Sequence, residues 1–435
     1  MARPINADVP ATAPGKAPKK NPPPKPPAPK KPKRQRKPVP AALKAVAALF
    51  GLAIVFIVAA IVGGGGGGES TETPAPVGAP PEAPAGQTPD QLGYPGFATA
   101  NTTRVGGGDA ASNAAAVALA AYPSGAPSRQ PDAVVLVDAA DWRSAIAAAV
   151  LMAPPLGAPP LIGEADGVPA PTEEALDALD PTGGKDSKGT RVFAVGAAAA
   201  PSGLQTKRVG RGGGTAAAAE IAALRDHLLG APPSHIVVAP AADPAFAMPA
   251  AGWAARSGDP ILFADEDTLP QPTAAVLRRH HHTPVFVLGP SSAISSEVVR
   301  RIAKIVDDVH RVSGEDPASN AIAFARYADG GFGWNVNDPG HGFVVARSDE
   351  PLDAVAAAAL SAAGAWGPLL LSDSADTLPA ALRGYLLDVK PGYTTDPTRA
   401  FYNHVWVIGN QEAISVNEQA EIDEEAALAK IGGEG

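Results

Sequence analysis

Three stretches of the chain, each about one hundred residues long, repeat the same order of short motifs, and this repetition constrains the fold most. Their openings are TRVGGGDAASNAAAVALA from Thr103, KRVGRGGGTAAAAEIAAL from Lys207 and HRVSGEDPASNAIAFARY from His310. Each opening carries one arginine at the same position, and an alanine-rich segment follows. Six elements recurring in one order are difficult to produce by chance, so we expect three similar structural units.

Within each unit, short continuous apolar runs alternate with segments that have the composition of helices. The runs lie at 133–139, 235–241, 342–348, 159–165, 259–265 and 367–373, and a third set ends at Gly196, Gly289 and Gly409. Uninterrupted apolar runs indicate strands buried on both faces, as in a parallel sheet covered by crossover helices. We therefore predict an α/β fold of three tandem repeats with parallel sheets, at 99–204, 205–307 and 308–425, with a C-terminal tail at 426–435.

Several motifs recur at matched positions of the repeats. They are PILF from Pro260, PLLL from Pro368, TLP at 268–270 and 377–379, and AIS at 293–295 and 413–415. Together with the openings, these motifs resemble the type-2 cell-wall-binding repeat family of bacterial surface proteins. The resemblance covers about residues 99–425. It implies Rossmann-like or toprim-like units in a three-fold or pseudo-three-fold arrangement, which attach proteins non-covalently to anionic cell-wall polymers.

The resemblance also implies a set of ligand-binding residues. They are the opening arginines, the acidic and amide residues that follow them, and one helix aspartate: Arg104, Asp109, Asn113, Arg208, Arg311, Asp316, Asn320 and Asp353. Salt bridges between repeats would explain the recurring arginines equally well. The family's second opening arginine is replaced here by Ala110, Gly214 and Pro317, which removes contacts suited to phosphate or carboxylate groups.

The segment before the repeats has a different composition. Residues 1–40 are rich in Pro, Lys and Arg and are predicted to be a disordered tail. Residues 41–62 include 18 consecutive uncharged, mostly apolar residues, close to the roughly 20 that span a bilayer as a helix. The basic cluster precedes this span, so the positive-inside rule places the N-terminus in the cytoplasm and the repeats outside the cell. A Gly- and Pro-rich linker is predicted at 63–98. A cleaved signal peptide is the alternative to an uncleaved anchor.

Charge and composition exclude several classes of function. Residues 1–62 hold 12 of the 35 Lys and Arg but one of the 44 Asp and Glu, which leaves a net charge of about −20 on the rest. A surface of that sign disfavours nucleic acid as a partner. Cysteine is absent, which excludes disulfides and thiolate chemistry.

Other candidate sites have simpler explanations. The Gly-rich openings lack the GxxxxGK[ST] spacing, so a turn that begins a helix accounts for them. His280 to His282 are adjacent, and adjacent residues of a helix point in different directions rather than toward one metal ion. The tryptophans could line a sugar-stacking cleft or pack in the core: Trp253, Trp334, Trp366 and Trp406. We expect no catalytic residues, metal or cofactor.

The sequence thus predicts a single-pass membrane protein whose three extracellular repeats bind cell-wall polysaccharide or a secondary wall polymer. Its other partner would be the lipid bilayer, through residues 41–62. The alternative function is an envelope scaffold that binds proteins rather than glycan. A third hypothesis, a hydrolase or transferase acting on wall glycan, would need a catalytic acid unique to one repeat.

Overall fold

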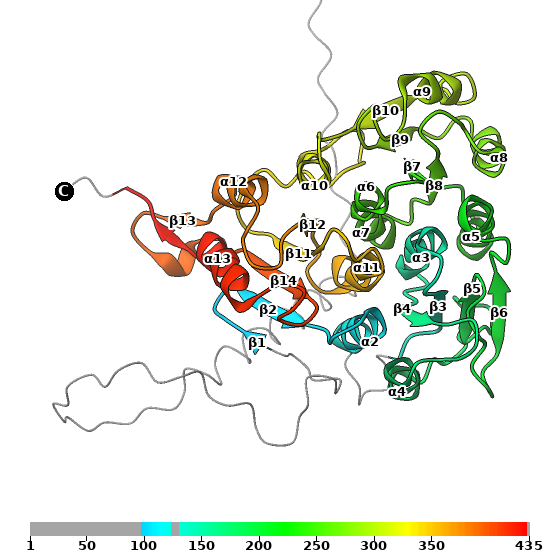
Figure 1. Ribbon diagram of the computed structural model, residues 1–435, viewed down its shortest axis with the longest axis horizontal. Coiled ribbons are helices and arrows are strands. Elements are labelled where there is room, and N and C mark those ends of the chain that lie inside the picture. Colours follow the sequence, from blue (N-terminus) through cyan, green and yellow to red (C-terminus); the bar gives the residue numbers. More distant parts are fainter. Residues whose placement is uncertain (1–96, 123–129, 433–435) are drawn as a thin grey trace, which may run out of the picture. The chain divides into compact units, whose positions relative to one another are not determined.

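The computed structural model describes residues 97–122 and 130–432, where the strands form three mainly parallel sheets and a short two-stranded sheet (Figure 1). β1 Phe97–Ala98 precedes the first repeat, which contributes β2 Thr102–Val105, β3 Val134–Asp138, β4 Pro160–Gly163 and β5 Val192–Val195. The second contributes β6 Thr206–Val209, β7 Ile236–Pro240, β8 Ile261–Ala264 and β9 Val285–Leu288. The third contributes β10 Val309–Val312, β11 Gly342–Arg347, β12 Leu369–Ser372, β13 Gly392–Tyr393 and β14 His404–Ile408, and β15 Ala429–Lys430 follows it. The expected α/β class with parallel sheets is confirmed.

Helices connect these strands in the order that the sequence predicts. They are α2 Ala110–Ala121, α3 Trp142–Ala148, η2 Ala149–Met152, α4 Ala170–Leu179, α5 Gly214–Leu229, α6 Pro244–Ala247, α7 Pro249–Ser257, α8 Gln271–Arg279, α9 Ser296–Ile302, α10 Pro317–Arg326, α11 Asp353–Ala363, α12 Ala380–Asp388, η3 Pro397–Arg399 and α13 Val416–Ala426. Several begin at an Asp or Ser whose side chain accepts a bond from a backbone N–H of the first turn: Asp109, Asp141, Ser295, Asp316 and Ser415.

Each repeat's opening strand joins the sheet of the preceding repeat. The orders are β4-β3-β5-β6 for the first sheet and β8-β7-β9-β10 for the second. The third sheet, β12-β11-β14-β2-β1, takes its fourth strand from the first repeat, and β14 and β2 pair in parallel, with Ile408 opposite Val105. All three sheets therefore have the same order of four parallel strands, and the N-terminal strand closes them into a ring.

The middle of the ring is built from one alanine-rich segment of each repeat. These segments are α3 with η2, α7 and α11, which contact one another between the three sheets (Figure 1). Small side chains let the helix backbones approach closely, and Gly252 of α7 is an example, because a Cβ there would lie 2.7 Å from Ser361 Oγ of α11. One continuous cluster of buried apolar side chains runs through all three repeats.

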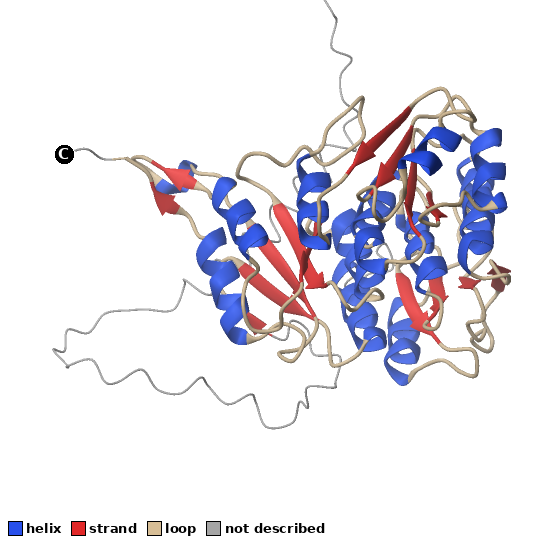
Figure 2. Cartoon of the chain, turned by 45° about the horizontal axis from the view of Figure 1, so that its top comes forward, coloured by secondary structure: helices blue, strands red, loops and turns tan. Residues whose placement is uncertain are grey.

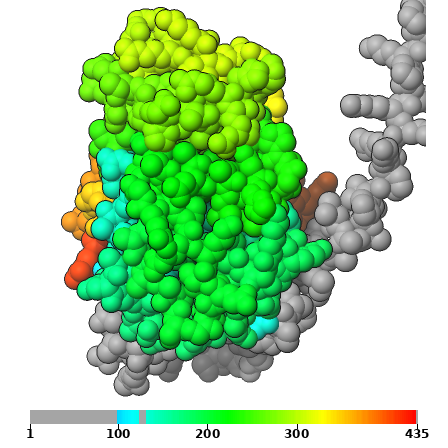
Figure 3. Space-filling view, turned by 90° about the vertical axis from the view of Figure 1, so that its right-hand side faces the viewer, coloured from blue at the N-terminus to red at the C-terminus, as the bar shows by residue number. Residues whose placement is uncertain are grey.

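Both ends of the described chain form short strands. The two-stranded β13–β15 sheet lies near the C-terminal end (Figure 2), so residues 429–430 of the predicted tail are paired. The face that carries α5, β6 and α8 is formed largely by the second repeat (Figure 3). Residues 97–98, at the end of the predicted linker, form β1.

The predicted tail at 1–40 and membrane span at 41–62 lie outside the described residues, as does most of the linker. Within 97–122 and 130–432, no helix is both long enough and apolar enough to cross a bilayer. The transmembrane helix therefore stays a prediction.

Candidate functional site

The carboxyl ends of β2, β11 and β14 border a cavity of about 270 Å³, which we call the closure cavity. Its polar lining residues are Asp109, Asn113, Arg347, Asp349, Glu350, Asp353, Asn410 and Glu412. In the third sheet β12 lies on one side of β11 and β14 on the other, so the connections leave in opposite directions at this point. Parallel sheets of α/β proteins bind ligands at such a switch point, beyond the carboxyl ends of the strands.

Three of the predicted site residues meet in the closure cavity although they come from opposite ends of the repeat array. Asn113 Nδ2 donates to Asp353 Oδ1 at 2.8 Å, and Asn113 Oδ1 accepts from the backbone N–H of Gly107 at 2.8 Å. Asp109 caps α2 beside them. Gly106 has a φ of +127°, and a Cβ there would lie 2.4 Å from Asn113 Oδ1, so the turn requires glycine.

The electrostatic environment of Asp353 is unusual. Its side chain is almost completely buried, and this burial raises the pKa of its carboxyl to about 7, against the opposing bond from Asn113. The neighbouring carboxylates of Glu350, Asp349 and Asp109 contribute to this raised pKa. Near neutral pH, Asp353 can therefore be a carboxylic acid that donates as well as accepts hydrogen bonds.

The rim of the closure cavity is acidic. Arg347 donates from Nε and Nη2 to the two carboxylate oxygens of Asp349, at 3.0 and 2.8 Å, which offsets its charge. Glu350 and Glu412 are exposed and add further negative charge. This lining suits hydroxyl-rich or cationic groups better than phosphates. Within the described ranges, no group of three or more His, Asp or Glu side chains is placed to hold a metal ion.

Arg104, predicted as a ligand-binding residue, has a different role. Its guanidinium is 4% exposed and donates to the carbonyl oxygens of Gly409, Asn410 and Ile414 and to Gln419 Oε1. These groups belong to the loop and helix that follow β14, the strand beside β2. Since its donors are committed within the chain, Arg104 fastens the first strand to the last repeat and is not available to a ligand.

The equivalent arginines make weaker versions of the same contact. Arg311, half-buried, donates to the carbonyls of Gly289 and Ile294 at 2.5 and 2.7 Å, and exposed Arg208 donates to the Ala198 carbonyl at 2.7 Å. Neither of the two interpretations offered above for the arginines, salt bridge or ligand contact, describes these bonds. A guanidinium with several donors satisfies the carbonyls of a turn after a neighbouring strand, which explains why arginine recurs.

Asp316 and Asn320 do not reach the closure cavity. They lie at the boundary of the second and third repeats, where Asp316 caps α10 and buried Asn320 donates to the Phe246 carbonyl at 3.4 Å. At the boundary of the first and second repeats, Ala217 occupies the position of Asn113, and Ser144 occupies that of Asp353. Of these three matched positions at the repeat boundaries, the one where the ring closes therefore brings a side-chain amide to a side-chain carboxyl.

Five of the eight polar residues that line the closure cavity were not among the predicted site residues. Arg347 ends β11, and the segments that follow β11 and β14 supply the others: Asp349, Glu350, Asn410 and Glu412. Both strands were predicted, so the rule that ligands bind beyond the carboxyl ends of parallel strands could have identified these residues.

No family model matches this chain, and no curated protein matches it. The structure is similar to Cwp6 from Clostridium difficile, with a TM-score of 0.61 and 20% sequence identity over 76% of this chain and 48% of that one. It is also similar to Cwp8 from Clostridium difficile, with a TM-score of 0.55 and 19% identity over 75% of this chain and 52% of that one. The chain thus spans about half the length of these solved chains. At this identity the likeness is one of fold.

Proposed function

We propose that residues 97–432 form the wall-binding head of a cell-surface protein and that the closure cavity contacts the wall polymer. The fold shared with the cell wall proteins Cwp6 and Cwp8 supports a surface location. The observation that carries the binding site is the meeting of Asp109, Asn113 and Asp353 at the switch point of one sheet. The head binds without catalysing a reaction in this proposal.

The polarity of the closure cavity favours a particular kind of polymer. Carboxylates and an amide accept hydrogen bonds from sugar hydroxyls, and a protonated Asp353 can also donate one. A phosphate-rich strand would be repelled by Glu350 and Glu412, and Arg347 is already paired with Asp349. The ligand is therefore a neutral or amine-bearing stretch of wall glycan.

The first part of the chain supplies the proposed attachment to the cell. Residues 41–62 span the membrane once, with the basic tail inside and the repeats outside. Protease added to intact, wall-stripped cells should digest the repeats and leave the tail protected. Digestion of the tail, or release of the whole chain by alkaline carbonate, would contradict this topology.

Wall binding is tested by sedimentation of the full chain, kept soluble in detergent, with purified lipid-free walls. The assay is run on walls with and without their secondary polymer, across a salt series. The variant Glu350→Gln/Glu412→Gln should lower the apparent affinity about tenfold, because sugar hydroxyls lose two charged acceptors. The matched control is Glu266→Gln/Asp267→Asn, which removes two exposed acidic charges from the loop after β8 and should change nothing.

Two results would contradict the proposal. The first is an unaltered chain that is not retained by walls at any ionic strength. The second is equal loss of retention in the cavity variant and in the control, which would indicate an effect of total charge rather than of the cavity. Capture from wall-free membrane extract, without retention on walls, would support the envelope scaffold instead.

A further inference from the structure

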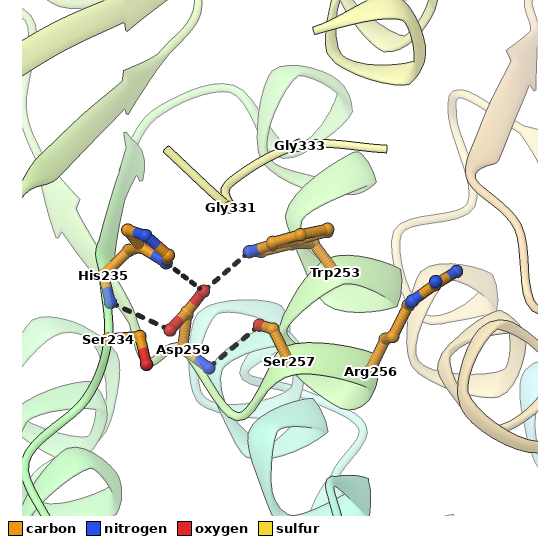
Figure 4. Close-up of a pocket in the computed structure, with 8 residues that line it drawn as sticks. All are labelled: Ser234, His235, Trp253, Arg256, Ser257, Asp259, Gly331 and Gly333. Carbon is orange, nitrogen blue, oxygen red and sulfur yellow. Dashed lines mark hydrogen bonds and ion pairs between the residues drawn. The ribbon is translucent and has the colours of Figure 1, made fainter. Parts of the chain in front are cut away.

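A second cavity, of about 350 Å³, lies at the amino ends of β7 and β8, in the second repeat (Figure 4). We call it the amino-edge cavity, and its main polar side chains are His235, Arg256, Ser257 and Asp259. Figure 4 shows His235 and Trp253 on either side of the Asp259 carboxylate, with Arg256 beyond Trp253. The segment from Gly331 to Gly333, of the third repeat, also lines this cavity.

The Asp259 carboxylate holds this arrangement together. It is 1% exposed, and Oδ1 accepts from the backbone N–H of His235 at 3.0 Å. Oδ2 accepts from Trp253 Nε1 at 2.9 Å and lies 3.1 Å from His235 Nδ1. Both oxygens are thus occupied by groups of the chain. Asp259 fixes the orientation of the imidazole rather than binding a ligand itself.

The remaining polar groups are suited to an anionic partner. The contact with Asp259 places the proton of His235 on Nδ1, so Nε2 accepts from a hydroxyl when the ring is neutral and donates to an anion when it is protonated. Ser257 Oγ accepts from the Asp259 N–H, which leaves its hydroxyl proton to donate. Arg256 uses Nη1 for the Trp366 carbonyl at 2.6 Å and keeps its other N–H groups. Arg256 therefore offers a positive charge with free donors in this cavity, on a chain that is acidic as a whole.

This set of residues is not part of the repeat. The strand registers place Ala133 and Gly342 at the positions of His235, and Ala158 and Gly367 at those of Asp259. In the third repeat these positions leave no space, because a Cβ on Gly367 would lie 1.7 Å from the Gly342 carbonyl oxygen. A structural requirement of the fold would have appeared in more than one repeat. The cavity is specific to the second.

The carbonyl that Arg256 contacts belongs to a strained aromatic residue. Trp366, whose carbonyl accepts from Arg256, has a φ of 56° and a side chain that is 54% exposed. The left-handed backbone region is unfavourable for a bulky residue, and an exposed tryptophan gains little from burial to offset the cost. Exposed tryptophans provide flat surfaces on which sugar rings stack.

We propose that the amino-edge cavity binds a single sugar residue carrying a carboxylate or a phosphate. His235, Ser257 and Arg256 hold the anionic group and neighbouring hydroxyls. The volume is at the small end for ligand sites, which fits one sugar residue and not a long polymer. This site is separate from the closure cavity and does not depend on wall binding.

Isothermal titration calorimetry of the full chain in detergent tests the proposal, with three probes: glucuronate, glucose 6-phosphate and glucose. At least one charged sugar should bind about tenfold or more tightly than glucose. Binding of glucuronate alone assigns a carboxylate ligand, and binding of glucose 6-phosphate alone assigns a phosphate. Arg256→Gln and His235→Gln should each weaken that binding about tenfold. The matched control is Arg300→Gln, an exposed arginine on α9 that pairs with Glu297.

Two results would overturn the proposal. One is that neither charged sugar binds more tightly than glucose. The other is that Arg256→Gln and His235→Gln keep the affinity of the unaltered chain while their melting temperatures show that they are folded. The Glu350→Gln/Glu412→Gln variant should bind the charged sugars normally, so a failure of the wall-binding proposal is distinguishable from a failure of this one.

Discussion

Replacing Arg104 with methionine should destabilise the head strongly, because the side chain keeps its length but loses every donor. Three acceptors would be left without a partner: the carbonyls of Gly409 and Ile414, and Gln419 Oε1. The Asn410 and Ser415 carbonyls, which Arg104 also contacts, keep the backbone N–H groups of Ile414 and Gln419. A buried acceptor without a partner costs about 1–3 kcal/mol, and relaxation of the loop recovers part of the total. We expect Arg104→Met to lower the free energy of unfolding by about 3–5 kcal/mol.

The repeats provide graded controls for this substitution. Arg311 donates to two carbonyls and is half-buried, so Arg311→Met should cost about 1–2 kcal/mol. Arg208 is exposed and donates to one carbonyl, so Arg208→Met should cost less than about 1 kcal/mol. Burial lowers the pKa of Arg104 to about 10, against the influence of Glu418, so it remains charged at neutral pH and the comparison is between three cations.

Urea unfolding followed by tryptophan fluorescence measures the three variants, since Trp406 lies on β14, beside β2. The predicted order of destabilisation is Arg104, then Arg311, then Arg208. Equal effects at the three positions would refute the reasoning. The same holds for an Arg104→Met chain that keeps its stability but loses ligand binding, because this would show that Arg104 contacts the ligand.

Two further predictions concern single side chains. Burial raises the folded-state pKa of Asp353 to about 7, above an unfolded value near ~4, so unfolding releases a proton between these values. The unaltered chain should therefore lose stability relative to Asp353→Asn as pH rises from about 4 to about 7, and a difference independent of pH would contradict the assignment. Gly367→Ala should destabilise by more than ~2 kcal/mol, because its Cβ would overlap the Gly342 carbonyl, whereas Gly384→Ala in α12, with nothing within 4 Å, should stabilise by ~0.5–1 kcal/mol. Thermal unfolding measures the melting temperatures of the two glycine variants. Equal melting temperatures of Gly367→Ala and Gly384→Ala would contradict this prediction.

The strands and helices were predictable because their patterns are local. Continuous runs such as VVLV in β3 and LLL in β12 indicate buried strands without knowledge of their neighbours. Likewise Asp109 and Asp316, directly before alanine-rich segments, mark the beginnings of α2 and α10.

The pairing of the strands was not predictable in the same way. β2, β6 and β10 fit the edge of any of the three sheets by composition, and their motifs carry no sign of which sheet they join. The role of Arg104 and the contact of Asn113 with Asp353 both follow from that choice, so sequence reasoning could name these residues without explaining them. The amino-edge cavity was missed because no repeated motif marks it, since His235 and Asp259 have no counterparts in the other repeats.

Closure of the ring by the first strand is the central structural claim, because it creates the cavity proposed to bind the wall. The chain has no cysteine, so an engineered pair reports this closure without interference. Thr103 and Trp406 are direct partners on β2 and β14, and neighbouring strands about 4.8 Å apart are within reach of a disulfide.

The decisive measurement is oxidation of the Thr103→Cys/Trp406→Cys chain, read by the shift of its unreduced band in gel electrophoresis. A closed ring predicts a disulfide in nearly all molecules, and none in Lys207→Cys/Trp406→Cys, because Lys207 belongs to the first sheet. Failure of the first pair to form, or equal formation of both, would contradict the closed ring.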